Sequence, residues 1–289
     1  MPRVTDRVPP FALVLAGIAS VQFGAALART MFDDLGAAGT SLIRVFFAAL
    51  VLMLVFRPDP RRYDVNALRW VLLFGVTLGL MNLTFYLALG RLDLGVAVTI
   101  EFIGPLAVAV FGSRRRLDLV WAALAGIGIV LLANPGPGES LDTLGLVYIL
   151  IAAACWAVYI LLSAATGRRF PGSSGLAIAM GVAAVAVTPV GIIAGGRALL
   201  RPEVLGAGLG IGLLSSIIPY SVELEALRRV PAKVFGIWMS LEPAVAALVG
   251  LVMLGQSLAG REWAAIGCVV VASAGAAWGS RRPAPPPEA

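Results

Sequence analysis

The sequence has no histidine, a single lysine (Lys233) and only two cysteines. Because Cys155 and Cys268 each lie alone inside an apolar segment, neither a zinc site nor a disulfide framework is expected. The sequence also lacks a GxxxxGK[ST] loop, so ATP hydrolysis is not expected. We therefore predict that the protein has no metal and no cofactor and is not an enzyme.

Charge is also scarce. Only 13% of the residues are charged, 60% are hydrophobic, and the mean hydropathy is +0.94, whereas a soluble domain carries about 25% charged residues. The chain is therefore expected to cross the lipid bilayer several times. The net charge of +6 comes from arginines clustered between apolar runs, which is the pattern of membrane loops rather than of a nucleic-acid surface. We expect no nucleic-acid partner.

Ten apolar segments are long enough, or nearly so, to cross a bilayer as helices. They are Phe11–Leu27, Thr40–Phe56, Leu68–Leu89, Leu94–Phe111, Leu117–Ala133, Leu144–Leu162, Ser174–Ala194, Val204–Leu227, Ala232–Leu254 and Trp263–Trp278. Five precede a Pro/Gly-rich loop at residues 134–138, and five follow it. The sequence thus predicts an all-α membrane protein with ten transmembrane helices.

An odd number of spans in each half makes the halves enter the membrane in opposite directions. The halves also share a spacing, since Arg91 precedes Pro105 by the same interval as Arg229 precedes Pro243. We predict two inverted five-helix repeats around a central cavity, the arrangement of many secondary transporters. Pairs of glycines four residues apart within the spans, such as Gly75 and Gly79, are interpreted as helix-packing positions.

Loop charges predict the orientation. Sixteen of the 22 basic residues fall on one side of the spans, five fall on the other, and Arg44 lies within a span. The positive-inside rule then places both termini in the cytoplasm. The expected organisation is a cytoplasmic N-terminus (1–10), a first repeat (11–133), a periplasmic linker (134–143), a second repeat (144–279) and a disordered cytoplasmic tail (280–289).

Two carboxylates lie close to prolines in the middle of apolar spans: Glu101 before Pro105, and Glu242 directly before Pro243. A charge at the bilayer centre costs about 2.5–3.5 kcal/mol on insertion scales, so such a residue is a candidate for function. Proline breaks a helix and frees backbone carbonyls, and we expect breaks or gates at Pro105, Pro219 and Pro243. The alternative for either glutamate is a structural hydrogen bond beside these prolines.

Other polar and aromatic side chains at a similar depth complete a candidate substrate site. They are Arg44, Asn82, Tyr86, Trp156, Tyr159, Trp238 and Ser240. Arg44 is expected a few residues inside the second helix, where it can pair with a carboxylate of the protein or of a substrate. Each aromatic residue alone could instead serve in packing. Together they would line a modest amphipathic cavity for a small molecule.

Four stretches carry a resemblance to a known family. They are GVAVTIEFIGPLAVA at residues 95–109, ACWAVYIL at 154–161, PYSVE at 219–223 and FGIWMSLEPA at 235–244. The chain resembles the drug/metabolite transporter superfamily, of the EamA type, and is most similar to bacterial threonine/homoserine exporters; aromatic amino-acid exporters are related. Two positions depart from the family pattern: Glu225 stands where an apolar residue is expected, and Gln256 where glutamate is usual.

The resemblance implies an exporter of amino acids in the bacterial inner membrane, threonine/homoserine-like and with a range that can include hydrophobic amino acids. It implies alternating access and proton-coupled antiport, with Glu101, Glu242 and Glu223 as candidate proton carriers. A monomer or weak dimer is expected. One alternative is an exporter of small drugs or other metabolites on the same fold. Another, an intramembrane lipid-modifying enzyme, is disfavoured because Glu223 and Glu225 lack a partner base or metal.

Overall fold

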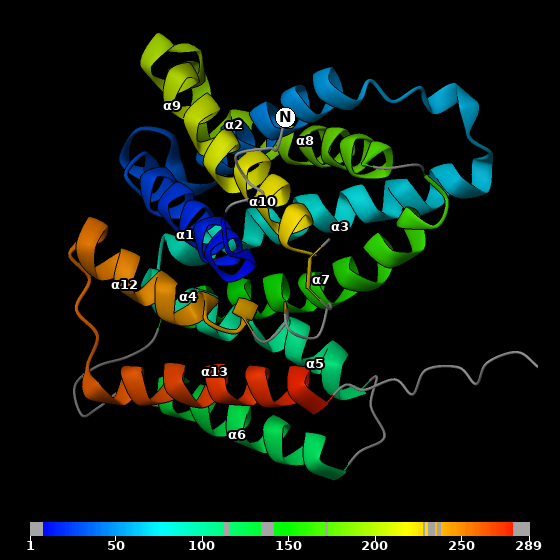
Figure 1. Cartoon of the computed structure of the whole chain (residues 1–289). Helices are drawn as coiled ribbons and strands as arrows, with labels where there is room; N and C mark the ends of the chain where they lie inside the picture. Colours follow the sequence, from blue (N-terminus) through cyan, green and yellow to red (C-terminus); the bar gives the residue numbers. More distant parts are fainter. Residues whose placement is uncertain are drawn as a thin grey trace, which may run out of the picture.

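A computed structural model of the chain describes residues 8–111, 116–133, 142–170, 173–227, 229–230, 235 and 238–279. The described part is helical and contains no strand. Within it, ten membrane-crossing segments are recognised, which confirms the predicted all-α membrane fold (Figure 1). Among the described residues, five helices are long and apolar enough to span a membrane on their own, and the shorter ones include the segments interrupted by a break or a loop.

The first repeat contains α1 to α6. Its helices are α1 (Pro10–Arg29), α2 (Phe32–Phe56), α3 (Val65–Leu89), α4 (Leu94–Glu101), α5 (Ile103–Phe111) and α6 (Arg116–Ala133). A short 3-10 turn, η2 (Pro60–Arg62), precedes α3. Helices α4 and α5 form one interrupted span. The break follows from Pro105, which has no N–H to donate to the carbonyl of Glu101 four residues earlier.

The second repeat contains the helices from α7 onward. They are α7 (Thr143–Gly167), α8 (Ser174–Gly195), α9 (Pro202–Gly212), α10 (Ile218–Leu227), α12 (Glu242–Leu254) and α13 (Gly260–Gly279). A 3-10 turn, η3 (Gly196–Leu200), follows α8. Between α9 and α10 the chain passes through a π-helical stretch, η4 (Leu213–Ile217), without leaving the span.

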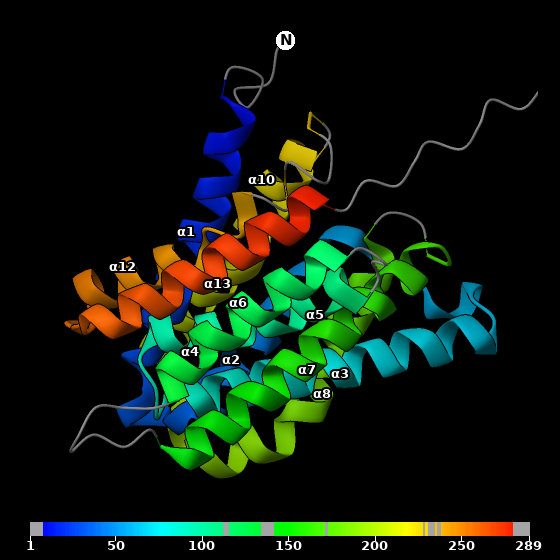
Figure 2. The same cartoon turned by 90° about the horizontal axis from the view of Figure 1, so that it is seen from below.

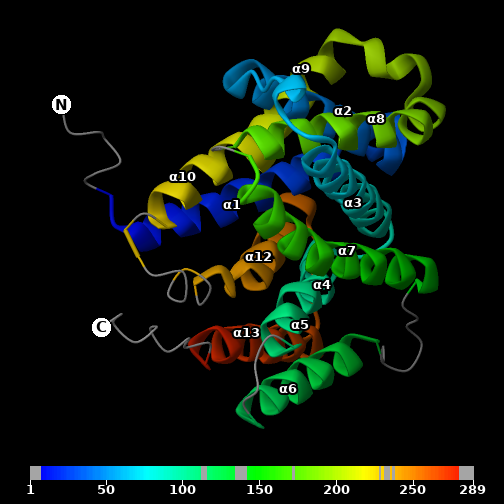
Figure 3. The same cartoon turned by 90° about the vertical axis from the view of Figure 1, so that its right-hand side faces the viewer.

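Helix packing follows the inverted symmetry of the two repeats. The second, fourth and fifth spans of the first repeat each pack on the span at the same position in the second repeat: α2 on α8, α4 on α12 and α6 on α13. The first span of each repeat instead packs on the third span of the other repeat, so α7 packs on α3 and α1 packs on α10. Figure 2 shows α3, α7 and α8 stacked together, and Figure 3 shows the start of α1 and the end of α13 at the same end of the bundle.

The predicted start of the second span, at Thr40, is wrong by eight residues because α2 begins at Phe32. The sequence there resembles a loop, since it contains Asp33, Asp34 and Gly36. The aspartates instead occupy the first helical turn, where the helix dipole favours negative charge. Gly36 adopts φ 65°, which produces a kink inside α2. Arg44 consequently lies at the middle of α2 rather than near its outer end.

Both glycines of the predicted packing pair Gly75 and Gly79 lie at close helix contacts. A Cβ atom at Gly75 would come within 2.6 Å of the Ala179 carbonyl oxygen, and one at Gly79 within 3.2 Å of the Ala183 backbone. Both neighbours belong to α8, so α3 and α8 approach as closely as only glycine allows. At Gly210, by contrast, a Cβ would meet nothing within 4 Å.

Candidate functional site

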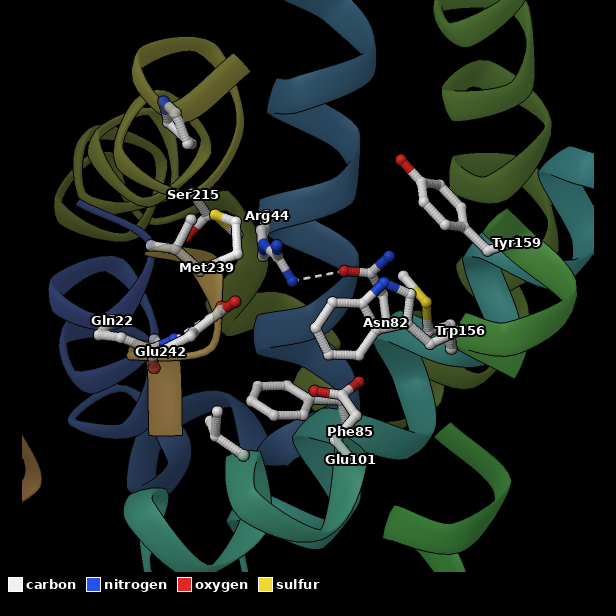
Figure 4. Close-up of a pocket in the computed structure, with 15 residues that line it drawn as sticks. Gln22, Arg44, Asn82, Phe85, Glu101, Trp156, Tyr159, Ser215, Met239 and Glu242 are labelled. Carbon is white, nitrogen blue, oxygen red and sulfur yellow. Dashed lines mark hydrogen bonds between the residues drawn. The ribbon is translucent and has the colours of Figure 1, made fainter. Parts of the chain in front are cut away.

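A cavity of about 280 Å³ lies between the two repeats (Figure 4). Its walls come from α1 to α4 of the first repeat and from α7, the η4–α10 region and the segment entering α12 of the second. The lining residues are Val21, Gln22, Ala25, Arg44, Met81, Asn82, Phe85, Val98, Glu101, Trp156, Tyr159, Ser215, Pro219, Met239 and Glu242. Mostly apolar walls with a few polar groups are typical of a small-molecule site.

Arg44 projects into this cavity from the middle of α2. Its guanidinium donates a hydrogen bond to Oδ1 of Asn82 and lies 5.4 Å from the ring centroid of Tyr86. Asn82 is held in turn, because its Nδ2 donates to the Leu78 carbonyl at 2.8 Å. Among the described residues, no carboxylate forms an ion pair with Arg44. Its charge is thus available to an anionic group in the cavity.

Glu101 is the last residue of α4, directly before the break at Phe102. Its side chain is only 9% exposed and reaches the cavity near Asn82 and Phe85, as Figure 4 shows. Within the described part of the chain, its carboxylate has neither a hydrogen bond nor a salt bridge. The break between α4 and α5 therefore follows directly on a buried carboxylate in the cavity wall.

Glu242 enters the same cavity from the second repeat. It is the first residue of α12, is 7% exposed, and accepts a hydrogen bond on Oε1 from Nε2 of Gln22 at 3.1 Å. Gln22 belongs to α1, so this bond joins the two repeats. Glu101 and Glu242 thus face one cavity from opposite repeats, together with the Arg44 cation.

A compact apolar cluster lies at one end of the cavity. Ala25 and Val98 line the cavity, and one turn beyond them Ala28 and Leu94 are fully buried against residues of both repeats, including Val249 of α12. Close packing of buried side chains leaves few voids larger than a water molecule. We call Ala28, Leu94, Val249 and the buried side chains packed around them the end cluster. It lies where α1 ends and α2 begins.

Polar contacts join the two halves of the chain at the same end of the bundle. Arg91 and Asp142 form an ion pair at 2.8 Å, and Asp142 also caps α7 by accepting from the Gly145 N–H at 2.8 Å. These contacts, led by the Gly145 bond, hold the pKa of Asp142 below its usual range. Burial and the nearby Glu262 carboxylate raise the pKa of Asp93, although Arg29 opposes them.

A model of the EamA-like transporter family matches residues 143–278. The threonine/homoserine exporter RhtA of Escherichia coli (strain K12) is 39% identical over 279 residues, which cover 95% of this chain and 94% of RhtA. The chain belongs to the EamA-like transporter family. RhtA of Salmonella typhimurium (strain SL1344) is 38% identical over 286 residues, covering 98% of this chain and 97% of the relative.

The fold agrees with membership of this family and of the drug/metabolite transporter superfamily. A crystal structure with 18% sequence identity superposes with a TM-score of 0.60 and covers 92% of this chain and 97% of its own. At that identity the likeness supports the fold alone. Both RhtA relatives are named as transporters, as expected for a protein predicted not to be an enzyme.

The structure brings most predicted site residues of this EamA-like transporter to the cavity: Arg44, Asn82, Glu101, Trp156, Tyr159, Pro219 and Glu242. Trp156 is oriented by an edge-on contact with Phe102, with ring centroids 5.4 Å apart. Pro219 follows the π-helical stretch that carries Ser215. Pro105 and Pro243 lie beside the cavity glutamates, at the break after α4 and in the first turn of α12.

Three residues predicted to bind the substrate lie outside the cavity lining. Tyr86 is fully buried beneath Arg44, Ser240 is buried before α12, and Trp238 packs against Phe11 with ring centroids 5.3 Å apart. A one-dimensional estimate of depth does not show the direction in which a side chain points, which explains these differences. The side chain of Glu223 lies outside the described residues.

Sequence reasoning missed several lining residues, including Gln22, Ser215 and Met239. The sequence contains a feature that could have pointed to Met239. It precedes Pro243 by four residues, just as the cavity residue Glu101 precedes Pro105. Gln22 could also have been noticed, because it is an amide side chain inside an otherwise apolar span. Of the two family departures, Glu225 is explained by an ion pair with Arg229 at 2.5 Å, and Gln256 accepts from the Leu94 N–H at 3.0 Å.

Proposed function

We propose that this protein exports small amino acids of the threonine/homoserine type across the bacterial inner membrane. The observation that carries the proposal is the Arg44 guanidinium, which shares one cavity with Glu101 and Glu242 without an ion pair to a described carboxylate. A zwitterion needs a cation for its carboxylate and an anion for its ammonium group. The 39% identity to RhtA, a threonine/homoserine exporter, supports the same substrate class.

The substrate carboxylate would bind at Arg44. The guanidinium presents several N–H donors in a planar fork that matches a carboxylate, and Asn82 holds it in place. The ammonium group would lie toward the glutamates. A cavity of about 280 Å³ is at the lower limit of ligand pockets, which span about 300–1,000 Å³. It therefore suits a small metabolite better than a large drug, and its apolar wall can also accept hydrophobic amino acids.

Transport would proceed by alternating access of the cavity to the two sides. Support comes from the inverted repeats, from the interruption between α4 and α5, and from the end cluster, which packs across one end of the cavity in this conformation. For export, the end cluster would separate to release substrate. The predicted cytoplasmic termini place this end toward the periplasm, with a linker there between repeats 11–133 and 144–279.

Protons would supply the energy, as antiport. A buried carboxylate that takes up a proton from the outside and releases it inside can return the carrier after substrate leaves. Glu101 and Glu242 fit this role through their burial and their position in the cavity, and Glu223 is the third candidate. A cationic-drug exporter is the less favoured function, because the Arg44 charge would repel a cation.

Proteoliposomes that hold the purified full-length protein and radiolabelled threonine test the proposal. We expect efflux that depends on an imposed pH gradient of either sign, and a loss of at least about 10-fold in that dependence for Glu101→Gln or Glu242→Gln. Glu203→Gln is the matched control, since Glu203 lies in the first turn of α9, away from the cavity. Efflux indifferent to pH would indicate a facilitator. Folded protein that moves no threonine would disprove the assigned substrate.

A further inference from the structure

We propose that Gln22 and Glu242 together form a subsite for the substrate's ammonium group, separate from the Arg44 and Asn82 pair that holds the carboxylate. This inference rests on the proposed function and deepens it. Of the two cavity glutamates that are candidate proton carriers, it assigns Glu242 to the substrate and leaves Glu101 for the proton. It also gives Gln22, on the first helix, a direct part in binding.

The carrying observation is the state of the Gln22 amide. The side chain is 2% exposed, it lines the cavity, and its Nε2 donates to Oε1 of Glu242 at 3.1 Å. Its own oxygen, Oε1, is buried and has no hydrogen-bond partner among the described residues. A buried acceptor left unpaired is costly to the folded protein, so a ligand donor that reaches this oxygen on entering the cavity would stabilise this wall.

The orientation of the amide follows from its partner. An ionised carboxylate only accepts hydrogen bonds, so the amide must turn its N–H toward Glu242 and its oxygen away. The reverse arrangement would bring two acceptors together. The pair therefore offers both a negative charge and a fixed neutral acceptor. An ammonium group, with a positive charge and three N–H donors, can bind both at once.

The positions of the two charges in the cavity complete the argument. In Figure 4, Gln22 and Glu242 lie on one side of the cavity and Glu101 on another, with Arg44 facing the space between them. The carboxylate and ammonium of an amino acid are separated by a single carbon, so the two subsites must face one small cavity, as Arg44 and the Gln22–Glu242 pair do. Glu101 has no described polar partner to lose when it gains or releases a proton.

The test measures binding to the purified full-length protein in detergent by titration calorimetry. The ligands are L-threonine and 3-hydroxybutanoate, which replaces the ammonium group by hydrogen and keeps the carboxylate and hydroxyl. We expect the unaltered protein to prefer threonine by at least about 10-fold. Gln22→Leu should weaken threonine binding by about 10-fold or more, the size expected for one hydrogen bond to a charged group, and leave 3-hydroxybutanoate unchanged.

Glu242→Gln keeps the shape of the side chain and should remove the preference for threonine, which guards against a folding defect in Gln22→Leu. Ser273→Ala is the matched control, because Ser273 is also buried with no described partner but lies on α13 outside the cavity. An equal loss for both ligands, or unchanged threonine binding, would overturn the subsite while amino-acid transport stands. A protein that binds neither ligand would overturn both proposals.

Discussion

The side-chain oxygen of Gln256 accepts a hydrogen bond from the backbone N–H of Leu94 at 3.0 Å. Leu94 is the first residue of α4, and Gln256 follows the end of α12, so the bond ties the two repeats together beside the end cluster. Gly250 leaves room for it, because a Cβ there would lie 2.5 Å from the Gln256 oxygen. The glutamate that the family resemblance leads one to expect here and this glutamine share the required feature, a side-chain oxygen that accepts a hydrogen bond.

Gln256→Leu should therefore destabilise the protein, and Gln256→Glu should not. The leucine leaves the Leu94 N–H without its acceptor, which costs about 1–3 kcal/mol for a buried donor. The glutamate keeps an acceptor in place. Apparent Tm values in detergent, followed by tryptophan fluorescence, compare the two. Equal Tm values for both variants would show that the bond contributes nothing to stability.

Asp142 should make stability depend on pH. Because its folded-state pKa is lowered, chiefly by the Gly145 N–H, its contribution is present above its unfolded pKa of about 3.9 and is lost as the pH falls below it. The Tm difference between the unaltered protein and Asp142→Asn should be largest near neutral pH and shrink below about pH 4. A difference that stays constant with pH would contradict this.

Asp93 should show the opposite sign. Its pKa is raised by burial and by Glu262, so the ionised form costs the folded protein stability at neutral pH. Asp93→Asn removes that cost and should be at least as stable as the unaltered protein near pH 7. Its advantage should disappear below about pH 4, where Asp93 is protonated in both the folded and the unfolded chain. A loss of stability at pH 7 would contradict the assigned cause.

Arg44→Lys should raise the KM for threonine by at least about 10-fold even though the charge is kept. Lysine cannot present the planar pair of donors that a carboxylate accepts, and it would lose the orientation given by Asn82. Uptake or efflux in proteoliposomes at several threonine concentrations gives the KM. If lysine serves as well as arginine, then charge alone suffices and the fork geometry is not used.

Two tryptophans provide a matched pair. Trp238 packs on Phe11 and on the apolar cluster of Leu13 and Val14, so Trp238→Leu should lower the Tm and leave the KM within about two-fold. Trp156 lines the cavity, so Trp156→Leu should change the KM and the preference among amino acids more than the Tm. Selectivity altered in Trp238→Leu alone would reverse this assignment.

Gly75→Ala and Gly210→Ala make the same chemical change at a crowded and an open position. The added methyl group at Gly75 would collide with the Ala179 backbone oxygen at 2.6 Å, whereas at Gly210 it meets nothing within 4 Å. Gly75→Ala should destabilise the protein by about 1–3 kcal/mol, as overpacking does. Gly210→Ala should leave the Tm unchanged or slightly higher, because alanine favours helix. The Tm values in detergent check both.

Sequence alone was enough to predict the fold class, because the bilayer imposes apolar spans of fixed length and every such span is helical. It also singled out Glu101, Glu242 and Arg44 as candidates, since a charge within an apolar span is conspicuous wherever the helix turns. Chain breaks near Pro105 and Pro243 follow from the missing proline N–H. These are local properties, and they do not depend on which helix lies beside which.

The tertiary structure decided which of the polar side chains share a cavity. Trp238 and Trp156 have similar depths in the sequence, yet one faces Phe11 and the other the cavity, because the rotation of a helix is set by its neighbours. Gln22 and Glu242 are separated by 220 positions and meet only when α1 packs against α12. Long-range pairing of this kind depends on helix packing, and no local pattern in the chain encodes it.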